Sequence, residues 1–387
     1  MPVLVVPVFY KVDPSDVRHQ RGSFGQALAH HKSRLKHNLE KVTRWREALT
    51  KASNLSGLHF IDGSHESKFI DTIVEGISAQ LLDRIHLSVA KYPVGIESRV
   101  EDMLKLLRVG EDDVRMVGIW GIGGIGKTTI AKGVYKSIAH NFEGSCFLEN
   151  VRERSIRYGG LVELQNSLLS KILKEKDFRI TSVDEGITLI KERLRHKKVL
   201  LVLDDVNHLN QLNKLVGMSD WFGLGSRIII TTRDKRWLIA HDVNHIYKMK
   251  ELSHHEALEL FKFNAFKENQ KMDDYVELID NITLYAQGLP LALEVLGSFL
   301  RGRNVDQWKV SLDGYGREPK KEIQEILRRS YDALDDLIKE IFLHIACFFK
   351  GKAKNYVIDI LRGCDLNPEY GIEVLTEKAL ISINEKK

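Results

Sequence analysis

The sequence predicts an α/β fold in which a parallel sheet carries helices on both faces and an all-helical region follows it. Three observations support this prediction. Apolar segments recur along residues 115–250 with helical patterns between them, and strands this apolar are buried on both faces, as in a parallel sheet. A glycine-rich loop directly follows the first of these segments. After residue 250, amphipathic helical patterns replace the strand patterns.

Length and composition are those of a folded protein with two or three domains. The chain has 387 residues, of which 43% are hydrophobic and 29% charged. Its net charge is +5, but residues 1–60 contain ten Lys/Arg and four Asp/Glu, so that segment carries +6 and the remainder −1. A basic groove along the whole chain is therefore not expected, and we predict no specific nucleic-acid partner.

Cysteine usage and hydropathy indicate a cytoplasmic or nucleo-cytoplasmic protein. Cys146, Cys347 and Cys364 are far apart and form no C-x-x-C pair, which fits a reducing compartment and argues against structural zinc. No apolar run reaches the ~18 residues of a membrane span. The apolar N-terminus lacks the basic region and cleavage site of a signal peptide.

The first ninety residues predict a strand, basic helices and a connecting helix. Residues 3–9 form a β-branched and aromatic run typical of a buried strand. Residues 25–56 are helical and basic. The basic run at 30–37 could contact nucleic acid or acidic lipid, although a solvated helix face is favoured. Residues 66–84 have helical spacing and predict a linker helix, and Lys91-Tyr-Pro-Val-Gly95 marks a domain boundary.

The later elements follow from the same patterns. Four strands are expected, at residues 115–120, 145–151, 198–204 and 226–232. A capping-box pattern at residues 253–256 begins an amphipathic helix that runs to Phe266. Its aromatic residues Phe261, Phe263 and Phe266 are expected in the core. Further helical patterns cover residues 273–300, 318–335, 336–349, 353–362 and 370–380.

The glycine-rich loop predicts a nucleotide site. Residues 121–129 read Gly-Ile-Gly-Gly-Ile-Gly-Lys-Thr-Thr and satisfy the phosphate-loop pattern G-x-x-x-x-G-K-[ST] between a strand and a helix. Glycines let the backbone approach phosphate oxygens, the lysine reaches the outer phosphates, and the first threonine hydroxyl contacts Mg²⁺. The nucleotide-binding candidates in this loop are Gly121, Gly123, Gly124, Ile125, Gly126, Lys127, Thr128 and Thr129.

Two adjacent carboxylates end a later strand. Asp204 and Asp205 follow the apolar run that begins at Val199. Such a pair is often a helix cap or a turn, but together with a phosphate loop the favoured interpretation is that Asp204 supports Mg²⁺. We assign Asp205 a weaker catalytic role in positioning water. Because fast ATPases usually place a longer acid there, slow hydrolysis is expected.

Arg233 follows the next strand, at residues 226–232. Ligands of open α/β sheets lie beyond the carboxyl ends of the strands, so Arg233 could contact the terminal phosphate. An arginine there would distinguish a diphosphate from a triphosphate. The alternative is a structural salt bridge to Asp234 or Asp204.

Six ordered motifs together resemble the NB-ARC module of plant disease-resistance receptors of the class with an N-terminal TIR domain. They are the phosphate loop, Phe147-Leu-Glu-Asn-Val-Arg152, the strand ending in Asp204-Asp205, Gly225-Ser-Arg-Ile-Ile-Ile-Thr-Thr-Arg233, Gly288-Leu-Pro-Leu-Ala292 and Phe342-Leu-His-Ile-Ala-Cys-Phe-Phe349. Residues 8–18 and 44–49 resemble the second half of a TIR domain, which is flavodoxin-like in that family.

The resemblance implies a domain order and a function. It implies a partial TIR segment at 1–60, a linker helix at 61–92, a nucleotide-binding domain at 93–252, a helical ARC1 subdomain at 253–325 and a truncated, winged-helix-like ARC2 subdomain at 326–387. It implies a STAND-type switch of plant innate immunity that is closed with ADP, opens on exchange for ATP, and then forms homo- or hetero-oligomers with related receptors.

The resemblance also assigns roles to single residues. Pro290 would pack on the nucleotide, and Val94, Gly95 and Ile96 would line the adenine. From the residues alone, Pro290 is simply a proline at a helix start, and both roles are compatible.

The departures from the family pattern restrict the expected activity. The catalytic glutamate of the TIR domain would lie before residue 1, so NAD cleavage is not expected, and the C-terminal Met-His-Asp motif and leucine-rich repeats are absent from the sequence. Two alternatives to the switch stay open. One is a phosphate-loop ATPase with true turnover, and the other is a truncated adaptor or decoy receptor that acts by protein–protein interaction.

Overall fold

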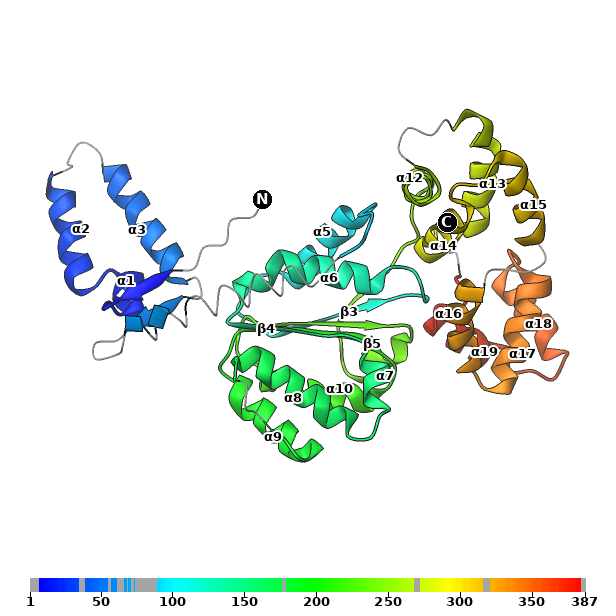
Figure 1. Ribbon diagram of the computed structural model, residues 1–387. Helices are drawn as coiled ribbons and strands as arrows, with labels where there is room; N and C mark the ends of the chain where they lie inside the picture. Colours follow the sequence, from blue (N-terminus) through cyan, green and yellow to red (C-terminus); the bar gives the residue numbers. More distant parts are fainter. Residues whose placement is uncertain are drawn as a thin grey trace. The chain divides into compact units, whose positions relative to one another are not determined.

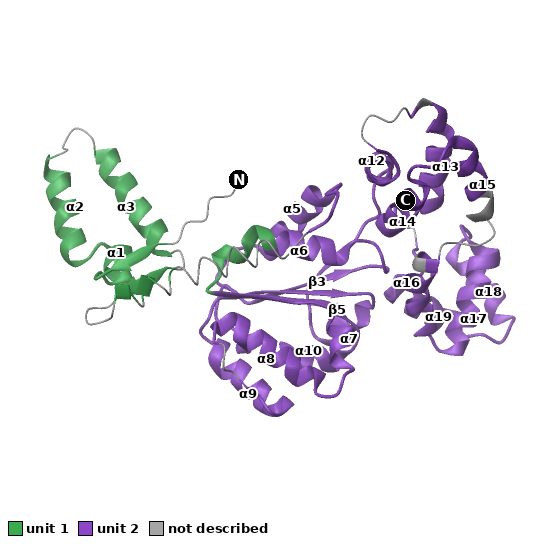
Figure 2. Ribbon diagram, viewed as in Figure 1, with its two compact units in different colours: residues 1–88, 136–143 green, residues 89–135, 144–387 purple. Residues whose placement is uncertain are grey.

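The computed structural model describes residues 7–34, 39–54, 57–60, 66–67, 69–70, 73, 89–175, 179–267, 272–315 and 321–383 (Figure 1). The chain forms two compact units, residues 1–88 with 136–143 and residues 89–135 with 144–387 (Figure 2). The first unit contains a two-stranded sheet and the second a five-stranded sheet. None of the helices in the described ranges is long and apolar enough to cross a membrane.

The first unit is a parallel β–α–β crossover. Strands β1 (Val8–Tyr10) and β2 (Leu58–Phe60) pair in parallel, and the helices α1 (Pro14–His19), α2 (Gly22–Arg34) and α3 (Leu39–Asn54) connect them. Parallel neighbours need such a long connection. The basic side chains of α2 that the structure describes are exposed, which is the solvated face favoured above. Most of the predicted linker helix at 61–92 lies outside the described residues.

The second unit is built on a parallel sheet of strand order β4-β5-β6-β3-β7. The strands are β3 (Arg115–Trp120), β4 (Gly144–Leu148), β5 (Val199–Val206), β6 (Arg227–Thr232) and β7 (His245–Lys248). All six residues of β6 are buried, as are all but one of the eight in β5. Burial of both faces is what the continuous apolar runs predict, and the predicted α/β fold class is confirmed.

Helices cover both faces of this sheet. Figure 1 shows α5 and α6 on one face and α8, α9 and α10 on the other. The helical segments around the sheet are α5 (Ile96–Leu107), α6 (Lys127–Ile138), α7 (Val151–Ser155), α8 (Gly160–Leu173), α9 (Val183–Leu194), α10 (Leu209–Leu215), η2 (Ser219–Trp221) and α11 (Lys235–Ala240). The short turn η1 (Ala139–Asn141) belongs to the first unit.

Two differences from the predicted strands have local causes. The strand expected at 145–151 ends at Leu148, because Asn150 adopts a left-handed conformation with φ 53° and α7 begins at the next residue. Strand β7 was not predicted. It has four residues at the edge of the sheet and none of them is buried, so it lacks the apolar run that marks the other strands.

The chain then forms a first helical layer. Its elements are α12 (His254–Ala265), η3 (Asp273–Tyr275), α13 (Val276–Ala286), α14 (Pro290–Leu300) and α15 (Val305–Tyr315). The helical pattern expected at 273–300 is interrupted because Gln287 and Gly288 both have positive φ. Phe261 and Phe266 are buried around Trp308, but the prediction for Phe263 is wrong. This residue is 45% exposed, and its ring stacks on Tyr92.

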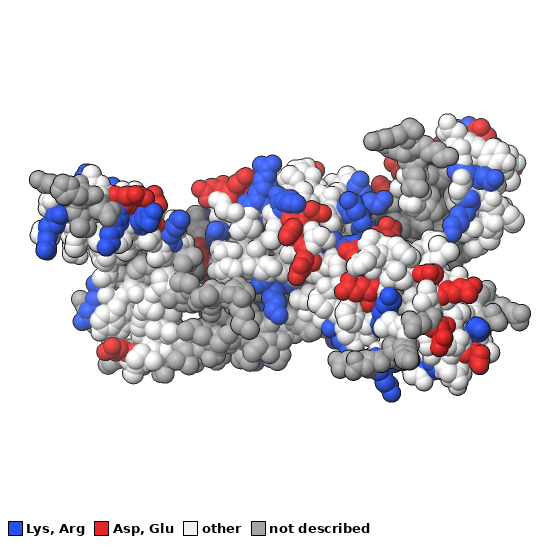
Figure 3. Space-filling view, turned by 90° about the horizontal axis from the view of Figure 1, so that it is seen from above, with Lys and Arg blue, Asp and Glu red and all other residues white. Residues whose placement is uncertain are grey.

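A second helical layer follows, with its own core of Ile341, Leu361 and Leu375 among others. It consists of α16 (Lys321–Asp332), α17 (Asp336–His344), the π-helical turn η4 (Ile345–Phe349), α18 (Lys354–Arg362) and α19 (Pro368–Glu377). On the face of the molecule in Figure 3, basic and acidic side chains are interspersed.

Candidate functional site

The phosphate loop joins the end of β3 to the start of α6. Gly124 and Gly126 have φ values of 80° and 94°, a left-handed conformation that costs glycine little. A Cβ atom on Gly124 would also lie 2.8 Å from the Cβ atom of Leu291. Backbone N–H groups in such a loop, beside a helix N-terminus, form an anion-binding concavity. The loop therefore has the geometry that its sequence predicts.

Lys127 lies inside this loop. Its Nζ donates hydrogen bonds to the carbonyl oxygens of Gly121 at 2.8 Å and Ile122 at 2.9 Å, and only 7% of the residue is exposed. Burial, followed by the positive charge of Arg233, lowers the pKa of Lys127 to about 7. A buried ammonium without a carboxylate in hydrogen-bonding contact is costly, so an anion in the loop would stabilise its charged form.

Thr128 and Asp204 meet across the site. The carboxylate oxygen Oδ1 of Asp204 accepts hydrogen bonds from the hydroxyls of Thr128 at 2.8 Å and Thr231 at 2.7 Å. Asp204 is 2% exposed, and burial raises its pKa. A hydroxyl beside a carboxylate is an oxygen donor pair suited to Mg²⁺, which completes its shell with water and phosphate oxygens. These residues fit the ion. The role of Thr231 was not predicted, although it stands in the Thr-Thr-Arg motif.

Asp205 does not face Thr128 and Thr231 as Asp204 does, but faces two arginines. Its φ is 57°, at an irregularity in the pairing of β5 with β6. Its carboxylate lies between two guanidinium groups, 3.6 Å from Nε of Arg152 and 3.6 Å from Nε of Arg233. Arg233 therefore forms an ion pair, as the alternative interpretation expects, but its partner is Asp205 and not Asp234 or Asp204. Asp234 instead caps α11 and binds Arg236.

Arg233 extends over the phosphate loop. A Cβ atom on Gly123 would lie 2.9 Å from Nη1 of Arg233. The same Nη1 donates a hydrogen bond to the carbonyl oxygen of Ile326 in α16, at 3.0 Å. Burial is the main cause that lowers the pKa of Arg233, and the neighbouring Arg152 and Arg329 add to it. One side chain thus contacts Asp205, the second helical layer and the space above the loop.

Pro290 begins the helix that rests on the same loop. It is the first residue of α14, as predicted for a proline at a helix start. The following N–H, of Leu291, donates to the carbonyl oxygen of Gly124 at 3.3 Å. The structure therefore places Pro290 beside the loop and adds Leu291, whose contact with Gly124 the sequence did not indicate.

Sequence relatives decide the family. The TIR domain model matches residues 2–93, the NB-ARC domain model residues 96–271, and the model "Disease resistance protein Roq1-like, winged-helix domain" residues 335–387. "Disease resistance protein RPV1" of Vitis rotundifolia is 47% identical over 380 residues, which are 98% of this chain and 27% of that protein. The chain belongs to the TIR-type NB-ARC disease-resistance proteins. This confirms the resemblance found in the sequence motifs.

A second relative is also a resistance protein. "TMV resistance protein N" of Nicotiana glutinosa is 40% identical over 388 residues, 98% of this chain and 33% of that protein. The chain thus spans about a third or less of these relatives. Among solved structures, a STAND protein of Pyrococcus horikoshii covers 73% of the chain, with 39% of its own length, at 17% identity and a TM-score of 0.31. Cdc6p of Pyrobaculum aerophilum covers 77%, with 89% of its own length, at 14% identity and a TM-score of 0.41.

The segment expected to line the adenine lies at the start of the NB-ARC match. Val94 packs on the core of the first helical layer, and Ile96 begins α5 and approaches Gly133 of α6. Gly95, with φ 67°, accepts a hydrogen bond from Arg99 at 2.6 Å. Arg99 also pairs with Glu256 at 2.8 Å. The segment thus connects α12 to the helix that begins at the phosphate loop.

The winged-helix region contacts the NB-ARC sheet through the end of α19. The indole N–H of Trp120 donates to the carbonyl oxygen of Glu377 at 2.8 Å. The carboxylate of Glu377 lies 3.3 Å from Arg236, and Lys378 lies 2.8 Å from Asp234. These polar contacts join residues far apart in the sequence, and nothing in the local pattern could have predicted them.

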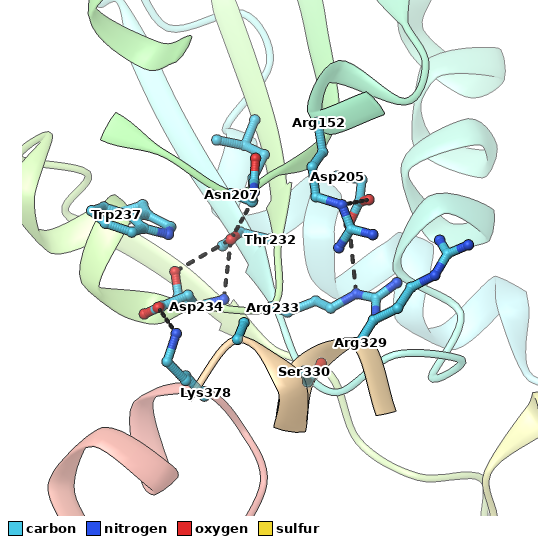
Figure 4. A pocket seen from close by; sticks show the side chains of 12 residues that line it. Arg152, Asp205, Asn207, Thr232, Arg233, Asp234, Trp237, Arg329, Ser330 and Lys378 are labelled. Atoms are coloured by element: carbon cyan, nitrogen blue, oxygen red, sulfur yellow. Dashed lines mark hydrogen bonds and ion pairs between the residues drawn. The ribbon is translucent and has the colours of Figure 1, made fainter. Parts of the chain in front are cut away.

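A cavity of about 100 Å³ lies between the ends of β5 and β6 and the helix α16 (Figure 4). Its lining includes none of the phosphate-loop residues at 121–129 and only Asp205 and Arg233 of the predicted site. The residues that line it are Arg152, Asp205, Val206, Asn207, Thr232, Arg233, Asp234, Trp237, Arg329, Ser330, Ala333 and Lys378.

Proposed function

We propose that the chain is the ADP/ATP-binding switch of a plant innate-immunity receptor, a STAND-type signalling NTPase that acts in the cytoplasm or the nucleo-cytoplasm. The observation that carries the proposal is the position of Arg233. It lies against Gly123 of the phosphate loop while it is bound to Asp205 and to the carbonyl oxygen of Ile326. A third phosphate would attract the same guanidinium and weaken its hold on α16.

Different residues of the site would bind different parts of the nucleotide. The N–H groups of residues 121–126 and the charged Lys127 would bind the phosphates, and Pro290 and residues 94–96 would enclose the base. Thr128 and Asp204 would hold Mg²⁺, which would neutralise charge between the outer phosphates when it is bound. Thr231 orients Asp204 through the 2.7 Å hydrogen bond.

Slow hydrolysis is consistent with the surroundings of Asp205. Its carboxylate already faces the guanidinium groups of Arg152 and Arg233, so it is not free to orient an attacking water. Such a site would retain its nucleotide rather than turn it over. ATP binding would then lead to homo- or hetero-oligomerisation with related receptors, as the family implies.

The nucleotide retained by the purified 387-residue chain tests the proposal. We expect ADP at close to one per chain by chromatography of the denatured protein. Lys127→Ala should lose it, whereas Lys136→Ala, an exposed lysine of the same helix, should keep it. Release of many phosphates per minute per chain would indicate a turnover ATPase instead. A Lys127→Ala chain that signals normally would favour the adaptor or decoy.

A further inference from the structure

The cavity beside Arg233 contains buried polar atoms without partners. Ser330 is 8% exposed, and its hydroxyl oxygen forms no hydrogen bond in the structure. The Nε atom of Arg233 is likewise buried without a hydrogen bond, because Asp205 at 3.6 Å is too distant for one. Both residues line the same cavity. Buried polar groups are nearly always satisfied, so two such atoms at one cavity indicate a bound group.

The charge of the residues that line the cavity indicates that the bound group is an anion. Four cationic side chains line the cavity, those of Arg152, Arg233, Arg329 and Lys378, against the two carboxylates of Asp205 and Asp234. Figure 4 shows the three guanidinium groups gathered on the side of Asp205 and Ser330, with Lys378 and Asp234 together at the other side.

The ion pairs leave this positive charge incompletely compensated. Lys378 and Asp234 are paired at 2.8 Å, but Arg152 and Arg233 share the single carboxylate of Asp205 at 3.6 Å each. Tight charge-assisted contacts are ~2.7–2.9 Å long. Arg329 binds Glu153, outside the lining, through side chains that are half exposed. Water can satisfy the orphaned hydrogen-bonding atoms, but only an anion also offsets the excess charge.

Size and donor geometry select the anion. A cavity needs a volume of roughly 10–15 Å³ to hold one water. The volume of about 100 Å³ therefore accommodates a tetrahedral oxyanion. Planar guanidinium groups match phosphate oxygens, and a hydroxyl can donate to them. We propose that this cavity binds a free phosphate ion between Arg152, Arg233, Arg329 and Ser330 while a nucleoside diphosphate occupies the phosphate loop.

The proposed ion would connect two parts of the second unit. Arg152 and Arg233 belong to the sheet side, on α7 and after β6, whereas Arg329 and Ser330 belong to α16. A phosphate bound to all four would hold α16 against the carboxyl edge of the sheet. The site goes beyond the proposed switch, since its lining excludes the phosphate loop and shares only Arg233 with the predicted contacts of the terminal phosphate.

Phosphate binding to the ADP-loaded 387-residue chain tests the proposal. We expect one phosphate per chain by equilibrium dialysis with labelled orthophosphate, and a rise in Tm relative to chloride at equal ionic strength. Each arginine would form a charge-assisted hydrogen bond with the ion, so Arg152→Gln or Arg329→Gln should weaken binding about tenfold or more. Arg328→Gln is the matched control, because this neighbouring arginine is exposed and does not line the cavity.

Ser330→Ala separates a ligand contact from a structural one. The Ser330 hydroxyl has no partner in the protein, so its removal should leave Tm in chloride unchanged or higher. The phosphate-induced rise in Tm should nevertheless fall. A loss of Tm in chloride equal to the loss in phosphate would instead show that the hydroxyl is structural, and would overturn its role.

Three further outcomes would overturn the proposal. Absence of phosphate binding while ADP is retained would remove the site and leave the proposed switch intact. Equal phosphate binding by all variants would indicate an adventitious ion only. In the third outcome, Arg152→Gln and Arg329→Gln lower the Tm of chains loaded with a non-hydrolysable ATP analogue, but free phosphate does not raise the Tm of ADP-loaded chains. The arginines would then contact only the terminal phosphate of the nucleotide.

Discussion

Nζ of Lys378 lies 2.8 Å from Oδ2 of Asp234, and both side chains are largely buried. The pair joins the end of α19 to the end of β6, two elements more than 100 residues apart. Asp234 also binds Arg236 at 3.0 Å, and these two cations lower its pKa although burial opposes them. This buried carboxylate is thus one of several contacts that join the winged-helix region to the parallel sheet.

Lys378→Ala should loosen this contact. Because Arg236 still compensates Asp234, we expect a cost of about 1–3 kcal/mol rather than the full penalty of an unpaired buried charge. Hydrogen exchange in residues 368–377 should accelerate accordingly. The control is Lys352→Ala, an exposed lysine of the same region. Equal exchange in both variants would show that the pair does not hold α19.

Nucleotide binding should take up a proton at Lys127. In the free protein its pKa is about 7, mainly because of burial, and phosphate oxygens would restore the charged form. At pH 8 we expect uptake of close to one proton per ADP and at pH 6 almost none. Calorimetry in buffers of different ionisation enthalpy measures this number. Uptake that is unchanged between the two pH values would contradict it.

The same lowered pKa predicts the pH dependence of stability without nucleotide. Between pH ~7 and ~10.5 the unfolded chain binds more protons at Lys127 than the folded chain does, so this residue makes the folded state more stable as pH rises. Below pH 7 the buried charged Lys127 lowers the free energy of unfolding by its full amount. Lys127→Met should remove this rise, which denaturant unfolding from pH 7 to 9 would detect.

Asp204→Asn should abolish the Mg²⁺ dependence of triphosphate binding. An amide can still accept the hydrogen bonds of Thr128 and Thr231, which are 2.8 and 2.7 Å long, but it loses the charge that attracts the ion. We expect Mg²⁺ to strengthen ATP binding at least about tenfold in the parent chain and little in the variant. ADP binding measured without Mg²⁺ is the internal control and should be similar in both chains.

Gly124→Ala should be more harmful than an alanine at an open left-handed glycine. Gly124 has φ 80° and its Cβ position is blocked by Leu291 at 2.8 Å, whereas Gly302 has φ 78° and open space. Left-handed alanine costs ~1–2 kcal/mol at either site, and only Gly124→Ala adds a clash beside the phosphates. We expect Gly302→Ala to retain ADP and Gly124→Ala to lose it. Rescue by Leu291→Gly, which removes the Cβ, Cγ and Cδ2 atoms that block the position, would establish the clash as the cause.

The fold was predictable where the pattern is strong and local. Strands β3, β5 and β6 are buried on both faces and stand out as apolar runs, whereas β7 at the sheet edge has no buried residue and was missed. Phe263 shows the limit of helical periodicity. Its position suits a core face, yet the residue is 45% exposed. Its ring stacks on Tyr92, a partner that no periodicity within one helix can reveal.

The sequence by itself determined the phosphate loop and the family, and it predicted the residues that we propose to bind phosphate and Mg²⁺. These depend on chemistry that a short motif contains, such as glycines at positive φ, one lysine, and a threonine at a helix start. The tertiary structure alone decided which partners these residues have. It placed Asp205 between Arg152 and Arg233, Thr231 on Asp204, Leu291 against Gly124, and Lys378 on Asp234. Such contacts join residues distant along the chain, and burial and charge pair them only after the elements have packed.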